Sequence, residues 1–335
     1  MLSRVADSIY WMSRYVERAE NVARFIDVNL NLMLDLPVGS AQQWQPLVHT
    51  TGDSQEFARR YAVANQHNVI HFLTFDQENP NSIVSCLRVA RENARSVREV
   101  IASEMWEQLN EFYLMVNSVT AKADSLTDPH ELFASVKMSS QLFAAVTDAT
   151  MTRNEGWHFC SLGRKLERAD KTSRILDVKY FLLLPTVADV GTTSEDIQWA
   201  AVLRSASAFE MYRKRHGRIS PDQIVEFLLL DHEFPRAIHY CLMGARESVH
   251  AITGTAPGMF RNQVEQLLGE LCSDLAYAHV DEIISSGLHE YLDRLQTKMN
   301  RVSEGIYEAF FAVRVAAPVV KPPRRRPLMT SPSVG

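Results

Sequence analysis

Several common signals are scarce or missing in this sequence. Its 335 residues include only 13 glycines and 13 prolines. Long stretches are therefore free of turn signals, which favours helices over many short strands. No run approaches the ~18 consecutive apolar residues that a spanning helix needs. Charged residues spread between Met1 and Leu34 leave no apolar export segment. We therefore expect an all-α protein that is cytoplasmic and makes no use of a membrane.

The common motifs of catalysis and cofactor binding are also missing. There is no G-x-x-x-x-G-K-[ST], G-x-G-x-x-G, H-E-x-x-H or G-x-S-x-G motif. The four cysteines form no C-x-x-C pair, which favours buried reduced thiols. His232 and His239 belong to the one polar cluster that resembles metal ligands, and the repeat described next does not keep them. We predict no metal and no cofactor. A net charge of −5 argues against nucleic acid as a partner.

What the sequence does contain is an internal repeat. Residues 44–92 placed over residues 199–247, a shift of 155, are identical at 13 of 49 positions. A second match, at a shift of 150, precedes the first in the same order, and we therefore predict that one multi-helix unit was duplicated. Further along the chain, His130-Glu131 is suggested to correspond to His289-Glu290. The second match pairs Arg14-x-x-Glu17-Arg18-Ala19-Glu20 with Arg164-x-x-Glu167-Arg168-Ala169-Asp170.

The repeat predicts a helical bundle of two pseudo-symmetric halves, residues 1–150 and 151–314, packed together. Each half is expected to have a long first helix, then a helix that opens at Trp44 or Trp199. A third helix is predicted to start at Pro80 or Pro235, followed by one or two closing helices.

Asn79 is expected to cap the helix at Pro80, and Asp76 and Glu78 are expected to lie near the positive end of its dipole. In the second half Phe234 holds the cap position, and Asp231 is the expected substitute. Residues 315–335 are rich in proline and carry four basic and no acidic residues. We expect them to form a disordered tail.

The first helix of each half has two contrasting faces. One face of the helix near the N-terminus is a continuous apolar stripe, as a core face should be. The opposite face mixes charged with aromatic residues, so we expect it to be covered and its charges to be paired. Local partners are available, Arg14 for Glu17 and Arg24 for Glu20. The stripe comprises Val5, Ile9, Met12, Val16, Ala19, Ala23, Ile26 and Leu30.

Three interpretations of the charged face remain open. In the first interpretation it is the interface of the two long helices, with the charges fixing their register. Alternatively, it lines a groove that binds an anionic or peptide-like ligand through arginine forks. In the third interpretation Glu17 or Glu167 is a general base. The candidate residues are Arg14, Glu17, Arg18, Arg24, Arg164, Glu167, Arg168 and Arg174.

The opening LSRVADSIYWMSRYVERAENVARFIDV, with Glu17-Arg18, resembles the start of the bacterial alpha-E family, a helical domain named for its Glu-Arg motif. The stretches GWHFCSLGRKLERAD, VLRSASAFEMYRKRHG and VEFLLLDHEFPRAIHYCL also resemble blocks of this family. The resemblance covers roughly residues 1–313, and the tail lies outside it.

Genes of this family commonly neighbour a circularly permuted ATP-grasp ligase and a transglutaminase-like peptidase. The resemblance therefore implies an accessory, non-catalytic component of a peptide-forming or peptide-modifying system. Its expected partners are the ATP-grasp ligase, the transglutaminase-like protein and a peptide. The alternative is an enzyme acting on peptide or amide bonds, with Glu17 or Glu167 as base.

Overall fold

The computed structural model describes residues 1–35, 44–120, 129–182 and 193–312. All regular secondary structure in these ranges is helical, as the scarcity of turn signals predicts. The first part of the chain forms α1 (Ser3–Asp35), α2 (Gln45–Thr51), α3 (Ser54–Arg60), α4 (Gln66–Thr74), α5 (Ile83–Ser96), α6 (Ser103–Thr120) and α7 (Pro129–Thr150).

The second part begins with another long helix, α8 (Glu155–Leu182), and a run of shorter helices follows it, as after α1. A five-residue π-helix, Tyr307–Phe311, closes the described chain. The helices after α8 are α9 (Thr193–Ser205), α10 (Phe209–His216), α11 (Pro221–Leu229), α12 (Ile238–Thr253), α13 (Gln263–Ala276), α14 (Val280–Ser285) and α15 (Leu288–Ile306).

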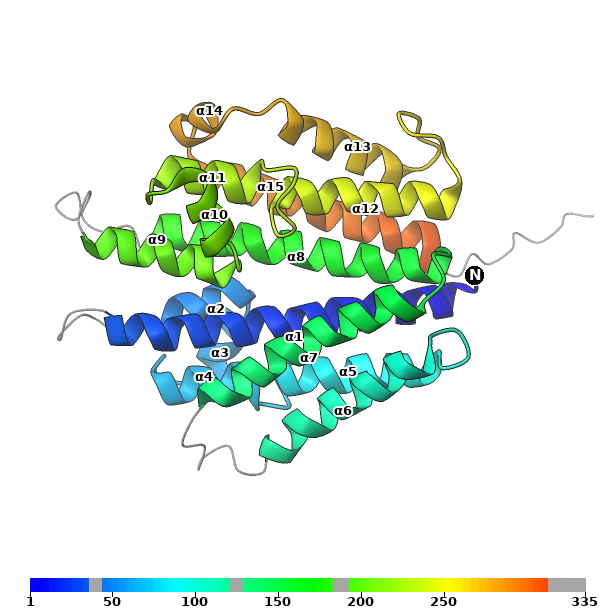
Figure 1. Cartoon of the computed structure of the whole chain (residues 1–335), viewed down its shortest axis with the longest axis horizontal. Helices are drawn as coiled ribbons and strands as arrows, with labels where there is room; N and C mark the ends of the chain where they lie inside the picture. The colour runs from blue at the N-terminus through cyan, green and yellow to red at the C-terminus, as the bar shows by residue number, and fades with distance from the viewer. Residues whose placement is uncertain (36–43, 121–128, 183–192, 313–335) are drawn as a thin grey trace, which may run out of the picture.

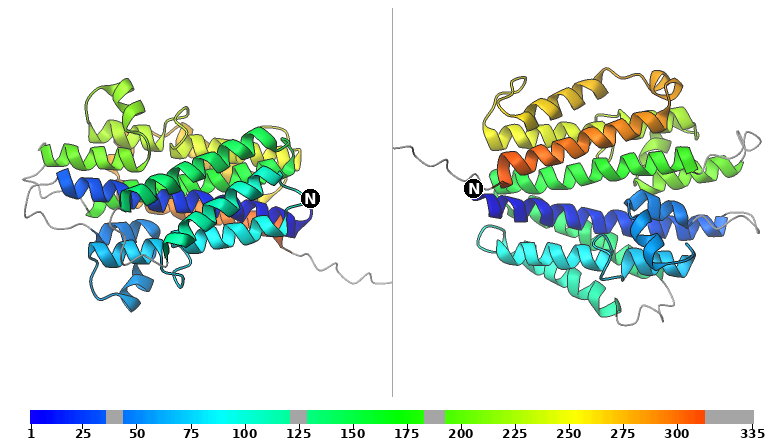
Figure 2. Two further views of the ribbon diagram at one scale, coloured as in Figure 1. Left: turned by 60° about the horizontal axis from the view of Figure 1, so that its bottom comes forward. Right: turned by 180° about the vertical axis from the view of Figure 1, so that it is seen from behind.

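The two long helices α1 and α8 lie side by side at the centre and run in the same direction (Figure 1). Helices α5 and α7 pack against α1, and α12 and α15 pack against α8. Figure 2 shows that α7 and α15 lie on opposite faces of the layer that α1 and α8 form. Each half therefore contributes its first helix to the seam and places its other helices outside.

Helix α1 is buried on both of its predicted faces. Ile9, Met12 and Ile26 of the apolar stripe are fully buried, and each such side chain contributes about 1.5–3 kcal/mol through the hydrophobic effect. On the opposite face Tyr10 and Phe25 are buried as well. The expectation that the mixed face is covered is therefore confirmed, and the covering element is α8.

The predicted starts of the third helices are wrong. α5 begins at Ile83, three residues after Pro80, and Ser82 caps it by accepting a bond from the backbone N–H of Ser85. Asn79 caps nothing there: its side-chain amide donates to the carbonyl of Phe72, which ties the preceding turn to α4. In the same way α12 begins at Ile238 rather than Pro235.

The acidic residues before these helices have an ion-pair partner that lies elsewhere in the chain. Arg60 pairs with Asp76 at 2.8 Å and with Glu78 at 3.5 Å. In the second half Arg215 pairs with both Asp231 and Glu233. Asp231 also accepts backbone N–H bonds of the turn that precedes α12.

The helices predicted to open at Trp44 and Trp199 differ in where they begin. α2 does open directly after Trp44, but Trp199 lies inside α9, which begins at Thr193. The tail predicted over residues 315–335 lies outside the described residues.

Candidate functional site

The two Glu-Arg motifs meet each other across the α1–α8 seam. Arg168 donates from Nε and Nη2 to the two carboxylate oxygens of Glu17, each at 2.8 Å. Arg18 donates in the same way to Glu167, at 2.6 and 3.0 Å. Both pairs are two-pronged, the geometry in which arginine binds a carboxylate most specifically. The motif is thus a reciprocal clamp between the long helices.

The predicted local pair of Arg14 with Glu17 is wrong. Arg14 donates from Nε to Glu167 across the seam, at 2.8 Å, because parallel helices in register bring that carboxylate closer. The other predicted local pair is confirmed, since Arg24 donates to Glu20 at 2.6 Å. Of the remaining candidates, Arg174 pairs with Asp170 at 3.0 Å, and Arg164 approaches Asp148 at 3.5 Å.

Arg236, in the turn before α12, belongs to the site although sequence reasoning missed it. Its guanidinium reaches Glu17 at 3.2 Å and Glu20 at 2.5 Å, and it is buried. The available signal was its place in the repeat, where it aligns with Asn81. We use the name Glu17 cluster for Glu17, Glu20, Asn21, Arg24, Arg168 and Arg236.

The corresponding group surrounds the second motif glutamate. Arg18 extends its third nitrogen, Nη1, to the side-chain oxygen of Asn81 at 2.6 Å. Lys171 lies 3.8 Å from Glu167 and 3.2 Å from Asp170. We use the name Glu167 cluster for Glu167, Asp170, Arg14, Arg18, Lys171, Arg174 and Asn81.

Both motif glutamates are held in their ionised form. Burial by itself would raise the pKa of Glu17, but the charges of Arg168 and Arg236 outweigh it and lower the pKa to about 2. Arg18 and Arg14 lower the pKa of Glu167 against the same effect of burial. A general base works best with a pKa near the working pH. This geometry therefore opposes the interpretation of either glutamate as a base.

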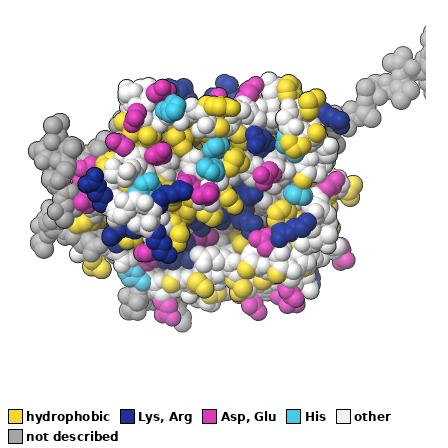
Figure 3. Space-filling view, turned by 45° about the horizontal axis from the view of Figure 1, so that its top comes forward, with side chains coloured by type: hydrophobic (Ala, Val, Ile, Leu, Met, Phe, Trp, Pro, Cys, Tyr) yellow, Lys and Arg dark blue, Asp and Glu magenta, His cyan; other side chains and the backbone are white. Residues whose placement is uncertain are grey.

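A polar cavity of about 150 Å³ lies beside the Glu17 cluster. Its walls come from α1, α7, α8 and the turn before α12. In the space-filling view, basic side chains gather around a hollow toward the middle of one face, with acidic side chains among them (Figure 3). The cavity is lined by Ser13, Val16, Glu17, Glu20, Ser140, Gln141, Phe143, Ala144, Thr147, Cys160, Arg164, Arg168 and Arg236.

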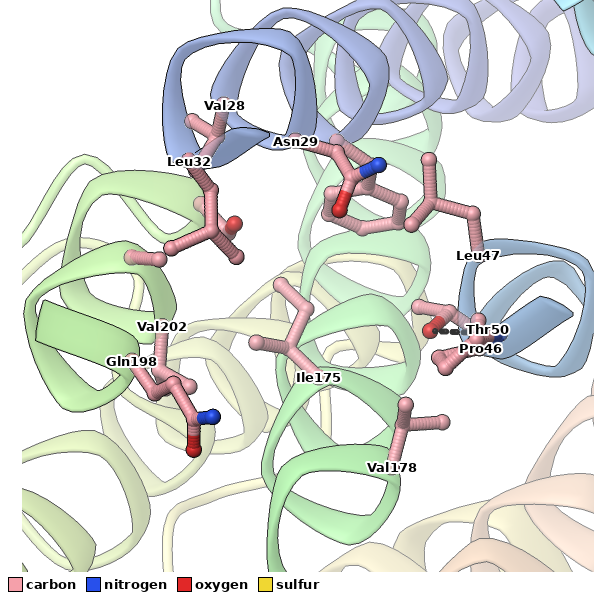
Figure 4. Close-up of a pocket in the computed structure, with 13 residues that line it drawn as sticks. Val28, Asn29, Leu32, Pro46, Leu47, Thr50, Ile175, Val178, Gln198 and Val202 are labelled. Atoms are coloured by element: carbon pink, nitrogen blue, oxygen red, sulfur yellow. Dashed lines mark hydrogen bonds between the residues drawn. The ribbon is translucent and has the colours of Figure 1, made fainter. Parts of the chain in front are cut away.

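An apolar cavity of about 70 Å³ lies at the other end of the seam, among α1, α2, α8 and α9 (Figure 4). The Nδ2 atom of Asn29, which is buried there, has no hydrogen-bond partner among the described residues. Much of the lining consists of residues at equivalent positions of the repeat, so the cavity lies where the two halves face each other. These are Phe25 with Ile175, Val28 with Val178, Pro46 with Ala201, Leu47 with Val202 and Thr50 with Ser205.

The cysteines and His239, the other residues with possible chemical roles, are buried and contact the protein itself. All four cysteines are free and buried, and burial raises the pKa of Cys86 to about 12. His239 places Nδ1 3.1 Å from the carbonyl oxygen of Leu230. Within the described ranges no group of three or more His, Cys, Asp or Glu residues could hold a metal ion.

The described residues thus define a helical bundle organised around two Glu-Arg motifs that pair across its central seam. Residues 1–311 match the Alpha-E family model, described as a predicted alpha-helical domain with a conserved ER motif, and the chain belongs to this family. The motif of that description is present twice, as Glu17-Arg18 and as Glu167-Arg168.

Similar proteins include uncharacterized proteins of Mycobacterium bovis and Mycobacterium tuberculosis, each 22% identical to this chain. The alignments cover 94% of this chain but only 37% of those proteins. No solved structure matches the chain. None of the helices in the described ranges is long and apolar enough to cross a membrane.

Proposed function

We propose that this chain is an accessory, non-catalytic protein of a peptide-forming or peptide-modifying system, and that it binds an ATP-grasp-type ligase or the peptide of that ligase. The observation that carries the proposal is the state of the motif glutamates. Both are ionised and saturated by arginines from the opposite helix, so neither is available as a base. What remains for the motif is to hold the two halves in a fixed relation, on which a binding surface can be built.

The length of the relatives supports a partner protein. In the mycobacterial proteins the region similar to this chain is only 37% of the whole. The region is therefore joined there to much more sequence. We propose that this region contacts the ATP-grasp-type ligase, and that the transglutaminase-like protein belongs to the same system.

We also infer that the two halves descend from one duplicated unit. The repeated sequence supports this, and so does the repetition of contacts that sequence alone did not link. His130 contacts Asp27 at 2.6 Å, and His289 contacts Asp177 at 2.5 Å. These two histidines are the pair suggested by the weaker end of the sequence alignment.

Co-expression with the neighbouring ATP-grasp-type ligase tests the proposal. We expect the two proteins to copurify, and binding measured by titration calorimetry to persist in the folded Glu17→Gln variant. The isolated chain should turn over neither peptide nor amide substrates. Turnover that Glu17→Gln or Glu167→Gln abolishes in a folded protein would establish the alternative enzyme. Failure of the ligase and of its peptide to bind would contradict the accessory role.

The alternative function, hydrolysis or transfer at a peptide or amide bond, is favoured by one observation, the cavity beside Glu17. It needs a carboxyl group that takes up a proton near neutral pH. The pKa of Glu17, lowered to about 2, opposes that requirement.

A further inference from the structure

The polar cavity lies beside the Glu17 cluster, and several residues that line it differ from their counterparts around the Glu167 cluster. Arg164 and Arg168 approach the Glu17 cluster from α8, and Arg14 and Arg18 approach the Glu167 cluster from α1. One turn before each arginine pair the residues differ. Position 10 is a buried tyrosine, whereas the equivalent position 160 is cysteine, a much smaller side chain that lines the cavity.

Helices α7 and α15, which pack outside the seam, also differ in the size of the side chains that face it. At the shift of 159 that relates His130 to His289, five of the six buried positions of α7 coincide with buried positions of α15, so the alignment holds along both helices. Ser140 and Thr147, which line the cavity, correspond to Met299 and Ile306, which are buried and apolar. The matching buried positions further along are Phe133 with Leu292, Val136 with Leu295 and Phe143 with Val302.

The equivalent arginines Arg14 and Arg164 also have different contacts. Arg14 donates to Glu167 at 2.8 Å and to the hydroxyl of Tyr10 at 3.0 Å. Arg164 is mostly buried, at 19% side-chain exposure, yet its contact with Asp148 is 3.5 Å long and Asp148 is largely exposed. An arginine offers five N–H donors, and among the described residues the contact with Asp148 is the one ion pair of Arg164.

The cavity wall has an excess of positive charge. Arg164, Arg168 and Arg236 line it, against the carboxylates Glu17 and Glu20. Burial, followed by the charge of Arg168, lowers the pKa of Arg236, against the opposite effect of Glu20 and Glu17. Ser13, only 5% exposed, adds a hydroxyl that lies beside the Cys160 thiol and has no hydrogen bond of ordinary geometry.

We propose that this cavity binds a carboxylate group, the C-terminus or an acidic side chain of a peptide, with Arg164 as its principal partner. The planar fork of arginine matches a carboxylate, and the Ser13 hydroxyl donates a further bond. A volume of about 150 Å³ is below that of ordinary ligand pockets, so only the end of a peptide enters. Gln141 is exposed and marks the rim. That the carboxylate belongs to a peptide rests on the proposed function.

Calorimetric titration of the full chain with the peptide Gly-Gly-Glu tests the inference, with the diamide of the same peptide, acetate and inorganic phosphate as comparisons. We expect the free peptide to bind, the diamide to bind at least tenfold more weakly, and acetate to compete better than phosphate. Arg164→Gln should weaken binding at least tenfold. Arg153→Gln should not, because Arg153 also pairs with Asp148 but does not line the cavity.

Substitutions that fill the cavity can be copied from the equivalent positions of α15. Ser140→Met with Thr147→Ile copies the filled side of the seam and should abolish peptide binding in a chain that still folds, although the 3.1 Å hydrogen bond from Ser140 to Glu20 is lost. A cooperative thermal unfolding transition checks that the variant is folded. Unchanged binding in the blocked variant or in Arg164→Gln would overturn the inference. So would absence of binding to the parent chain, or phosphate competing as well as acetate. Copurification with the ligase is a separate readout, so a failed cavity and a failed accessory role are distinguishable.

Discussion

The Glu17 cluster and the Glu167 cluster each neutralise a buried glutamate, but they do so with different residues. Each has a buried glutamate that receives a two-pronged arginine from the opposite helix. The Glu17 cluster takes its next cation from the turn before α12, where Arg236 stands, and has the neutral Asn21 on its own helix. The Glu167 cluster takes Lys171 from its own helix and has the neutral Asn81 in the turn.

These four residues occupy only two positions of the repeat, 21 with 171 and 81 with 236. The cation and the amide have exchanged places between the halves. A buried carboxylate is costly unless it is paired, and each glutamate has a further cation besides its two-pronged arginine, supplied from a different position in each half. The exchange also leaves the halves unequal: the cavity borders the cluster supplied by Arg236.

The largest expected effect separates the two glutamates. Glu167→Ala should lower the free energy of unfolding by about 3–5 kcal/mol, because Arg14 and Arg18 both lose their carboxylate partner in the seam. Glu17→Ala should cost less, because the adjoining cavity admits water or a solvent anion to Arg168 and Arg236. Urea unfolding of both variants measures the difference. Equal losses would mean that the cavity does not relieve the unpaired charge.

Acid should weaken the Glu17 cluster over a defined pH range. The pKa of Glu17 is lowered from 4.5 to about 2, so its ionised form stabilises the fold fully above pH 4.5. This stability is lost as the pH falls toward 2, by an amount on the order of 3 kcal/mol. Urea midpoints of the parent chain and of Glu17→Gln, measured between pH 6 and 3, test this. The variant should show the shallower decline; parallel curves would assign the acid sensitivity to other groups.

The exchange of cation and amide predicts a smaller effect with a compensating partner. Arg236→Asn should destabilise the chain by about 1–2 kcal/mol, since Glu17, Glu20 and Asn21 each lose one bond but Arg168 and Arg24 still pair with the two carboxylates. Adding Asn21→Lys rebuilds the arrangement of the other half and should recover part of the loss. The matched pair is Lys171→Asn with Asn81→Arg. A double-mutant cycle gives the coupling, and strictly additive losses would show that the positions are independent.

Much of the fold could be predicted from residue patterns alone. The scarcity of glycine and proline indicated helices, and the stripe containing Ile9 and Met12 identified the core face of α1 correctly. The aromatic residues among the charges of the opposite face indicated that this face is covered. Helix starts were predicted less well, because Asn79 bonds to Phe72 across a turn, and such a contact leaves no local signal.

The residues of the candidate site were predicted from the sequence, but most of the pairs that they form were not. The sequence identified Glu17, Arg18, Glu167 and Arg168 as a group, and by itself it determined that their charges need partners. Only the tertiary structure decided which partners these are. Parallel packing of α1 and α8 brings residues about 150 apart within 3 Å, so Arg14 pairs across the seam with Glu167. Local spacing carries no information on such a contact.

The sequence also determined that the two halves are alike, through the repeat. It could not show where the two halves differ around the cavity, because the substitutions concerned lie in separate segments of the chain. Cys160, Ser140 and Arg236 come from three segments, and each by itself is an ordinary change of side chain. Packing brings all three to one cavity beside Glu17, where their smaller volumes and added charge combine. That convergence is a property of the folded bundle alone.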